Sequence, residues 1–427
     1  QAIDSYRQAL RIQPDFAEVQ GNLGAALRDI GQLDSALICF RSVLDLHPHD
    51  AETLGNLGLT LHDLGKFDEA VSCYQKALVI DPNYAEAHNN LGFSLLMLKQ
   101  YENAAISYRR AIEINPSYVK AYNHLGIALH YLGQFDEAVT NYRCALTINP
   151  SFAEVHNNLG LSQIALGQID DAQISFRHAL EIKHDYFAAH TNLLLALNYT
   201  TQHSPAEYLA EALRYGENIA EKVTSRFTTW LCDPQPQRLR IGIVSSDLHN
   251  HPVGYFLESL VKQLDSSRIE LHAYPTHPKE DDLTARIKPC FNAWKPLVTL
   301  NDKAAAQLIH ADGIHILLDL TGHTAKNRLP VFAWKPAPIQ VSWLGYFAST
   351  GVAEIDYVLA DKTGVPDHQR VHFSETVWYL PDTRLCFTPP STDLPVEPLP
   401  CLSKGYITFG CFQNFLQRRL RRSKGPG

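Results

Sequence analysis

The sequence predicts an α-solenoid of helical hairpins followed by a doubly wound α/β domain. Three observations support this prediction: a repeat of 34 residues in the first half of the chain, the loss of that repeat after about residue 197, and alternating β-rich and helical segments from residue 239 onward. The chain has 427 residues, of which 45% are hydrophobic and 19% charged, so it is long enough for two or three domains with separate cores.

The 34-residue repeat is marked by a proline that closes each unit, because proline cannot donate an intrahelical hydrogen bond. These prolines are Pro14, Pro48, Pro82, Pro116 and Pro150. The pattern resembles that of tetratricopeptide (TPR) repeats, in which each unit is a pair of antiparallel helices. It predicts an array over 1–197: a leftover helix, five complete repeats and a degenerate last unit, in which His184 replaces the proline and Leu194 a recurrent glycine.

Asparagine recurs at the sixth position of the first helix in most repeats, at Asn22, Asn56, Asn90, Asn158 and Asn192. First helices line the concave groove of such solenoids, so these amides are placed to hydrogen-bond the backbone of a bound polypeptide. The alternative is that they stabilise only the packing of one repeat on the next. Because asparagine is unfavourable inside helices, a recurrent one needs a compensating role, and we favour polypeptide binding.

A helical linker is expected over 198–236, followed by an α/β lobe over 237–411. The run 239–245 is a β-rich apolar segment that ends in small polar residues, which is typical of a buried parallel strand. Further strands are expected at 269–274, 314–320 and 339–343, with helices at 256–264 and 303–310. In such a sheet, ligands contact the loops at the carboxyl ends of the strands.

Three of those loops carry unusual residues, at 246–256, 320–328 and 343–346. These segments resemble the N-terminal lobe of bacterial O-linked GlcNAc transferase homologues, over about 238–411. The resemblance implies a GT-B architecture of two Rossmann-like lobes and inverting transfer of GlcNAc from UDP-GlcNAc to Ser or Thr, with no metal and no cofactor. It also supports the polypeptide-binding interpretation of the asparagines, since such transferases are known for an asparagine ladder along their TPR groove.

The candidate catalytic residue is His251, which matches the proposed catalytic histidine of this family. Histidine suits a general base near neutral pH, since its unperturbed pKa is about 6.5. A lone loop histidine is more often a surface or structural residue, but the surrounding motif favours function here. Asp247 is a plausible anchor behind it. A metal site at His249 and His251 is not favoured, because no third ligand lies nearby in the sequence.

The remaining candidate pocket residues come from three places in the lobe. They are Thr321, Gly322 and His323 after one strand, His310 at a helix end, and Leu344, Gly345 and Tyr346, which match a loop of the donor sugar site. Many relatives continue this loop with Pro-Gly-Thr-Thr-Gly, whereas residues 347–351 here read Phe-Ala-Ser-Thr-Gly. Losing a proline and a glycine changes both loop stiffness and the approach of the backbone to a ligand.

Residues 406–412 resemble the strand that opens the second lobe, which in the family supplies the uridine and diphosphate contacts. Residues 412–427 do not resemble that lobe, and we interpret them as an aberrant basic tail with the second lobe absent. Because transition-state stabilisation requires both walls of the cleft, we expect negligible transfer by this chain alone. Two alternatives stay open: a TPR adaptor with a vestigial sugar-transfer domain, and a transferase with another nucleotide sugar or asparagine acceptors.

Composition narrows the partners and the compartment. The formal net charge of -8 gives no reason to expect nucleic acid binding, and the absence of an apolar run of about 18 residues argues against a membrane helix. Eight cysteines without a C-x-x-C pair are typical of reduced thiols, so we expect a cytoplasmic protein. The expected partners are acceptor polypeptides in the TPR groove and a nucleotide sugar.

Overall fold

The structure is a computed structural model that describes residues 1–200 and 203–386. The strand expected at 406–412 and the basic tail lie outside these residues. The described chain forms two compact units, residues 1–182 and 183–386. The first is an array of helical hairpins and the second contains a parallel sheet with helices, so the predicted fold class is confirmed.

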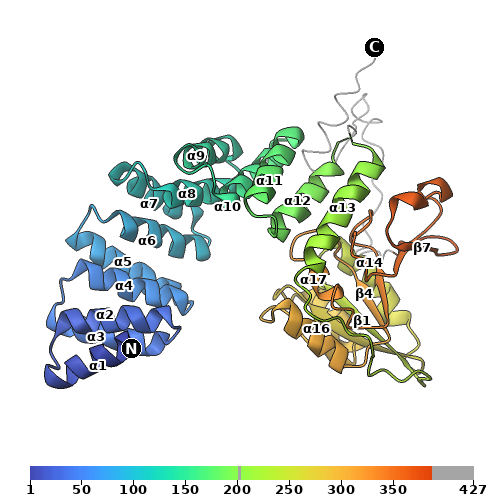
Figure 1. Ribbon diagram of the computed structural model, residues 1–427, viewed down its shortest axis with the longest axis horizontal. Coiled ribbons are helices and arrows are strands. Elements are labelled where there is room, and N and C mark those ends of the chain that lie inside the picture. The colour runs from blue at the N-terminus through green and yellow to red at the C-terminus, as the bar shows by residue number, and fades with distance from the viewer. Residues whose placement is uncertain (201–202, 387–427) are drawn as a thin grey trace, which may run out of the picture. The chain divides into compact units, whose positions relative to one another are not determined.

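The hairpins of the first unit follow one another along the chain (Figure 1). A single helix, α1 (Ala2–Ile12), precedes them. The five hairpins are α2 (Ala17–Asp29) with α3 (Leu33–Leu46), α4 (Ala51–Asp63) with α5 (Phe67–Ile80), α6 (Ala85–Met97) with α7 (Tyr101–Ile114), α8 (Val119–Tyr131) with α9 (Phe135–Ile148), and α10 (Ala153–Ala165) with α11 (Ile169–Ile182).

The recurrent glycine of the array is explained by the contact between the two helices of each hairpin. A Cβ atom added at Gly58 would lie 2.8 Å from Cε1 of Tyr74 on the second helix. An aromatic ring stands in the same relation to the equivalent glycine of every hairpin; the pairs are Gly24 with Phe40, Gly92 with Tyr108, Gly126 with Tyr142, and Gly160 with Phe176. These rings are almost fully buried, so any larger residue at the glycine would force the helices apart.

The second unit begins with two helices, α12 (Phe187–Leu197) and α13 (Pro205–Ala220). Ser204 and Glu207 form a capping box that starts α13. The sequence prediction ended the array at residue 197, whereas residues 183–197 pack with the second unit. Contacts with the lobe explain this: the carbonyl oxygen of Leu194 in α12 accepts from the Tyr346 hydroxyl at 3.4 Å, and Asn198, directly after α12, donates from Nδ2 to the same hydroxyl at 2.7 Å.

Seven parallel strands form one sheet in the order β3-β2-β1-β4-β5-β6-β7. Their bounds are β1 (Leu239–Ser245), β2 (Ile269–Pro275), β3 (Ala293–Trp294), β4 (Ile316–Asp319), β5 (Ile339–Ser342), β6 (Tyr357–Ala360) and β7 (Thr376–Tyr379). The strand order reverses between β1 and β4, and crevices at such a reversal are where doubly wound sheets bind ligands. Four of the strands were expected from the sequence, and β3, β6 and β7 were not.

The helices between the strands are α14 (Pro252–Gln263), α15 (Asp282–Ile287), α16 (Asp302–Ala311) and α17 (Leu329–Phe332), with short 3₁₀ turns η1 (Lys288–Cys290) and η2 (Asp367–His372). Helices α14 and α15 share a hydrophobic core with β1 and β2, in which Leu257 and Leu283 meet Ile243. This packing fixes the start of α14 above the carboxyl end of β1. The loop between them, residues 246–251, is therefore held against the edge of the sheet.

Candidate functional site

The loop that follows β1 is tied to the loop that follows β4. The backbone N–H of Ser246 donates to Oγ1 of Thr321 at 3.2 Å. The Ser246 hydroxyl donates in turn to Oδ1 of Asp247 at 2.7 Å, and the backbone N–H of Asp247 donates to Oγ of Ser245 at 3.0 Å. The first of these bonds joins the loops that follow the two strands flanking the reversal of strand order, and the other two shape the loop after β1.

His251 lies at the end of this loop and caps α14. Its Nδ1 accepts a hydrogen bond from the backbone N–H of Val253 at 3.3 Å, and Pro252 occupies the first helical position, as the sequence suggested. Oδ2 of Asp247 lies 3.8 Å from the same Nδ1. The His251 side chain is 41% exposed, so it can meet a ligand from solvent.

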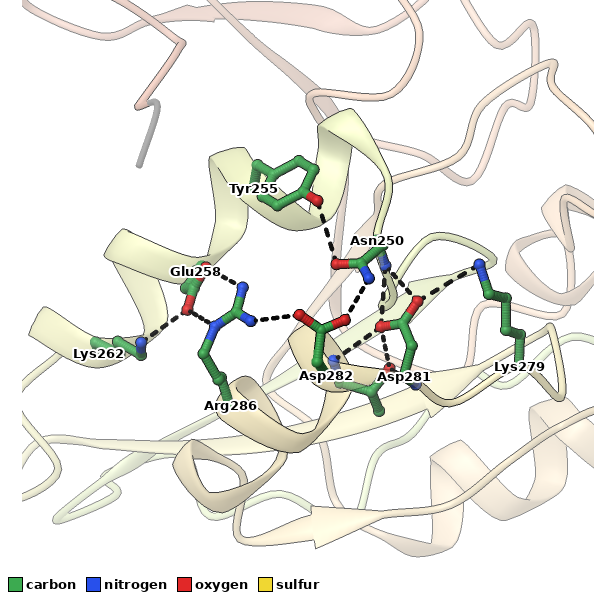
Figure 2. A network of polar contacts seen from close by, with 9 residues as sticks. Asn250, Tyr255, Glu258, Lys262, Lys279, Asp281, Asp282 and Arg286 are labelled. Carbon is green, nitrogen blue, oxygen red and sulfur yellow. Dashed lines mark hydrogen bonds and ion pairs between the residues drawn. The ribbon is translucent and has the colours of Figure 1, made fainter. Parts of the chain in front are cut away.

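A polar network holds the residue before His251 (Figure 2). The backbone N–H of Asn250 donates to both carboxylate oxygens of Asp281, at 2.8 and 3.1 Å, and its side-chain amide donates to Asp282. Arg286 links Asp282 to Glu258 of α14 with bonds of 3.0 and 2.7 Å. The loop is thereby fastened to both α14 and the start of α15.

The charges within this network reinforce one another. Glu258 is 4% exposed and receives hydrogen bonds from Arg286 and Lys262, which lower the pKa of its carboxyl to about 2. It therefore stays ionised across the physiological pH range. Because Arg286 is held by this buried carboxylate, the guanidinium presents a fixed donor to Asp282 and, through it, to Asn250.

Asp319 is a buried carboxylate that the sequence analysis missed. It ends β4, is 0% exposed, and accepts hydrogen bonds from the backbone N–H groups of Thr321 at 3.1 Å and Gly322 at 2.9 Å. Burial raises the pKa of its carboxyl to about 6 despite these bonds. Asp319 shapes the turn that carries Thr321 and Gly322, and the only signal for it in the sequence is an acidic residue at the end of an apolar run.

The loops after β4 and β5 approach each other closely. Gly322 has φ +55°, and a Cβ atom there would collide with the side chain of Tyr346; a Cβ atom at Gly345 would collide with the carbonyl oxygen of Leu320. Leu344 has φ +73°, a conformation that costs a leucine free energy. The predicted residues of these two loops are thus brought together, and close backbone approach explains both glycines.

His323 and Tyr346 are enclosed by the helices that open this unit. His323 is 0% exposed, its Nε2 lies 2.8 Å from the carbonyl oxygen of Thr350, and its ring contacts those of Tyr215 and Tyr346. Burial lowers the pKa of His323 to about 3. The Tyr346 hydroxyl lies 2.9 Å from that of Tyr208 on α13. In this conformation both side chains contribute packing and hydrogen bonds between α13 and the lobe, and neither faces solvent.

His310 is not brought together with His251. It lies in the last turn of α16, which leads into the amino end of β4, whereas His251 follows the carboxyl end of β1. Its ring stacks on Phe227 with centroids 3.9 Å apart, and its Nε2 lies 2.8 Å from the carbonyl oxygen of Thr229. These contacts attach the segment after α13 to the lobe.

The repeated asparagines make hydrogen bonds within the array. Nδ2 of Asn158 donates to Oδ1 of Asn123 in the preceding repeat at 3.1 Å, and Nδ1 of His124 lies 3.0 Å from Oδ1 of Asn89. The partners Asn89 and Asn123 are buried and were missed by the sequence analysis, although asparagine recurs there too. Asn56, Asn90 and Asn158 are half-buried and Asn22 is exposed; Asn192 lies in α12 of the second unit.

The inter-repeat bond of Asn158 uses only part of its hydrogen-bonding capacity. An asparagine side chain has two N–H donors and an acceptor oxygen. For Asn158, one donor reaches Asn123 and the oxygen accepts from Asn157 at 3.4 Å. Packing of the repeats and binding of a polypeptide are therefore compatible roles for the same side chain.

Residues 1–200 and 203–386 contain no group of three or more His, Cys, Asp or Glu side chains arranged to hold a metal ion. No helix in this part of the chain is long and apolar enough to cross a bilayer.

Comparison with known proteins assigns both units. The model of glycosyl transferase family 41 matches residues 187–387, and models of the tetratricopeptide repeat match stretches between residues 1 and 186. The structure of a Thermobaculum terrenum O-GlcNAc transferase mutant superposes with a TM-score of 0.66 and 32% identity, covering 74% of this chain and 60% of that one. The chain is a homologue of the family 41 glycosyltransferases.

Curated relatives agree with this assignment. The chain is 35% identical over 226 residues to the probable UDP-N-acetylglucosamine–peptide N-acetylglucosaminyltransferase SPINDLY of Solanum lycopersicum, a match over 52% of this chain and 24% of that protein. It is 38% identical over 151 residues to the UDP-N-acetylglucosamine–peptide N-acetylglucosaminyltransferase of Caenorhabditis elegans, over 34% of this chain and 13% of that protein. The chain thus spans about a quarter or less of these relatives' length. The family 41 match begins at residue 187, so it includes α12 and α13 with the sheet.

The loop at 347–351 is held by a buried carboxylate. Glu375 is 4% exposed and accepts hydrogen bonds from the Ser349 hydroxyl and the Thr350 backbone N–H, each at 2.7 Å, and from the Thr350 hydroxyl. Gly351 has φ +72°, and a Cβ atom there would collide with the carbonyl oxygen of Ala212 on α13. The loop therefore packs between α13 and the start of β7.

Proposed function

We propose that this chain acts in protein O-GlcNAc transfer: the TPR array binds the acceptor polypeptide, and His251 takes the proton of the acceptor Ser or Thr hydroxyl as GlcNAc leaves UDP. The observation that carries the proposal is the exposed imidazole of His251 beside the strand-order reversal, in a family 41 lobe. The names of relatives that transfer N-acetylglucosamine to peptides support the donor and the acceptor class.

The chemistry assigned to the residues follows from their positions. In an inverting transfer, the acceptor oxygen bonds to the anomeric carbon of the sugar while the bond from that carbon to the diphosphate breaks. A general base at hydrogen-bond distance from the acceptor hydroxyl typically contributes about 10²–10⁴-fold to the rate. The exposed His251 is placed for this task, whereas the enclosed His323 is not.

The test is addition of GlcNAc to acceptor peptides from UDP-GlcNAc, followed by mass spectrometry. The assay measures single turnovers at high protein concentration, so that a slow transfer still gives detectable product. We expect a product carrying the sugar on Ser or Thr, and a rate about 10²–10⁴-fold lower for His251→Ala. His310→Ala is the matched control, since that ring lies at the other end of the strands, and it should retain the wild-type rate.

The outcomes separate this proposal from the alternatives. Equal transfer rates for the wild type and His251→Ala would show that His251 is not the general base. Tight binding of polypeptide with no sugar transfer under any condition would favour the adaptor function. Transfer from a different nucleotide sugar, or to asparagine, would keep the reaction class and correct the substrates.

A further inference from the structure

The protonation site of His251 decides whether this residue can serve as a base. A neutral imidazole carries one proton, on Nδ1 or on Nε2, and only the other nitrogen has a free lone pair. Two polar groups lie at Nδ1 of His251: the Val253 N–H at 3.3 Å and Oδ2 of Asp247 at 3.8 Å. The His249 ring lies edge-on to the imidazole, with centroids 5.9 Å apart. The Val253 contact needs a lone pair on Nδ1 and the Asp247 contact needs a proton there, so the two contacts exclude each other.

We propose that Asp247 is a positioning residue that holds the proton on Nδ1 of His251, so that Nε2 keeps the lone pair that accepts the acceptor proton. This inference rests on the proposed function for its chemical purpose. A hydrogen bond to a carboxylate is roughly twice as strong as one between neutral groups, whereas the cap contact from Val253 is long at 3.3 Å. At 3.8 Å the carboxylate lies beyond hydrogen-bond distance in this conformation, and it becomes the stronger competitor for Nδ1 once the ring turns toward it.

The surroundings of Asp247 leave one oxygen for this role. Its Oδ1 accepts from the Ser246 hydroxyl at 2.7 Å, and its backbone N–H is bound to Ser245. The side chain is 14% exposed, so its orientation is restricted. Closing the 3.8 Å gap to an ordinary charge-assisted distance of about 2.8 Å requires the imidazole to turn by about 1 Å.

The backbone on both sides of His251 is held in place, so only the imidazole side chain needs to move. Asn250 is fastened to Asp281 and Asp282, and Pro252 restricts the main chain on the other side (Figure 2). The loop cannot carry the ring away from Asp247 without breaking these bonds. This clamp, formed by Asn250, Asp281 and Asp282, thus keeps His251 within reach of Asp247.

The proton balance is closed by these residues. The acceptor proton moves to Nε2, which produces an imidazolium ion with a proton on each nitrogen, and Nδ1–H continues to donate to Asp247. The carboxylate stabilises this cation by its opposite charge. The acceptor oxygen forms its bond to the sugar, and the diphosphate takes the electron pair of the broken bond.

The decisive experiment is nitrogen NMR of the 427-residue chain with ¹⁵N-labelled histidine, at a pH where the imidazole is neutral; the His251 signals are assigned with His251→Gln. We expect Nδ1–H to be the major tautomer in the wild type. In Asp247→Asn, the Ser246 hydroxyl keeps the amide oxygen as its acceptor, so the amide N–H faces Nδ1 and the major tautomer should become Nε2–H. Asp247→Ala should give the same change, because only the Val253 contact then remains.

Two further variants make the result specific. Asp247→Glu should return the Nδ1–H tautomer, at least in part, because it restores a carboxylate. Asp282→Asn is the matched control: it lies in the same clamp and is bound to Asn250 but does not contact His251, so it should leave the tautomer unchanged. A wild-type chain with Nε2–H as the major tautomer, or an unchanged ratio in Asp247→Asn, would overturn the inference.

The same variants distinguish this inference from the proposed function. In single-turnover assays, Asp247→Asn should lower the transfer rate by about 10²–10⁴-fold with little change in peptide affinity, since a base in the wrong tautomer binds substrate but takes no proton. The expected tautomers without any transfer by the wild type would sink the proposed function alone. Transfer by a wild type in the Nε2–H form would sink the inference alone.

Discussion

Two loops at the same edge of the sheet carry a glycine or proline and a histidine, yet the structure gives them opposite environments. The loop after β1 presents His251 to solvent at 41% exposure, while the loop after β4 encloses His323 at 0%. The first is fastened by hydrogen bonds to Thr321, Asp281 and Asp282, and the second is covered by α12 and α13. A motif therefore locates a loop at a site, and the elements that pack on that loop decide whether its histidine is available for chemistry.

We expect the largest effect on unfolding free energy from Glu375, the carboxylate that holds the enclosed loop at 347–351. Glu375→Ala removes the acceptor for three donors of Ser349 and Thr350. The Ser349 hydroxyl can donate to Ser374 instead, but the two Thr350 donors stay buried without a partner, so we expect the second unit to lose about 3–5 kcal/mol of unfolding free energy. Tryptophan fluorescence in urea measures this, because all five tryptophans lie in residues 230–378. Glu280→Ala, an exposed acid paired with Lys288, is the control and should cost under about 1 kcal/mol.

The two histidines give the next largest difference. His323→Ala leaves the Thr350 carbonyl unpaired and a cavity between Tyr215 and Tyr346, so we expect a loss of about 2–4 kcal/mol. His251→Ala removes only a helix cap and should cost about 1 kcal/mol. Both values come from the same urea titration. Equal losses would mean that the enclosure of His323 contributes nothing to stability.

Proton linkage provides a third test of the enclosed loop. The pKa of His323 is lowered to about 3 in the folded chain, against about 6.5 when unfolded, so the unfolded state binds more protons between these values. The stability conferred by this residue is therefore complete above pH 6.5 and is lost as the pH falls toward 3. Relative to His323→Gln, wild-type unfolding free energy should rise by up to about 1.4 kcal/mol per pH unit across this window.

Comparing the wild type with His323→Gln removes the contribution of a second titrating group, because that group is present in both proteins. The pKa of Asp319 is raised to about 6, which favours the folded state at low pH and opposes the trend from His323, but Asp319 is present in both proteins. A pH-independent difference between wild type and His323→Gln would contradict the enclosure of this histidine.

The smallest expected effect concerns the clamp of the open loop. Asp281→Ala removes the cap of α15 and the acceptor of the Asn250 N–H, so we expect about 1 kcal/mol of destabilisation and faster hydrogen exchange at the Asn250 amide. Mass spectrometry of exchanged peptides over 246–256 measures this. Asp265→Ala, which removes a turn acceptor elsewhere in the lobe, should leave that peptide unchanged. Unaltered exchange in Asp281→Ala would show that other contacts hold the loop.

Sequence reasoning predicted the array best, because one contact geometry recurs in every repeat. A glycine opposite an aromatic ring, as at Gly58 and Tyr74, imposes a strict spacing, and this spacing is visible in the sequence as the 34-residue repeat. It placed His251 at the start of a helix because Pro252 fixes a helix terminus. In the sheet it found β1, β2, β4 and β5. It missed β3, which has only two residues, and also β6 and β7, which have four residues each, as β4 and β5 do.

The residues that hold the loops were missed for a common reason. Asp319, Glu375 and Asn123 act on groups that are distant in the chain or provided by the backbone, and a single acidic or amide residue has no local signature. The burial of His323 was missed for the same reason, since Tyr215 lies more than a hundred residues earlier. Periodicity and motifs report local constraints, whereas burial depends on which segments meet in space.

The attachment of α12 and α13 to the lobe has a practical consequence for protein engineering. A lobe excised at the apparent end of the periodicity, after residue 197, would lose α12 and leave Tyr208 and Tyr215 without part of their cover. A graft that joins this lobe to a foreign recognition array should instead be spliced ahead of Lys183, where the two units divide. Binding specificity could then be changed by exchanging complete hairpins. The lobe would be transferred together with α12 and α13 as one fragment.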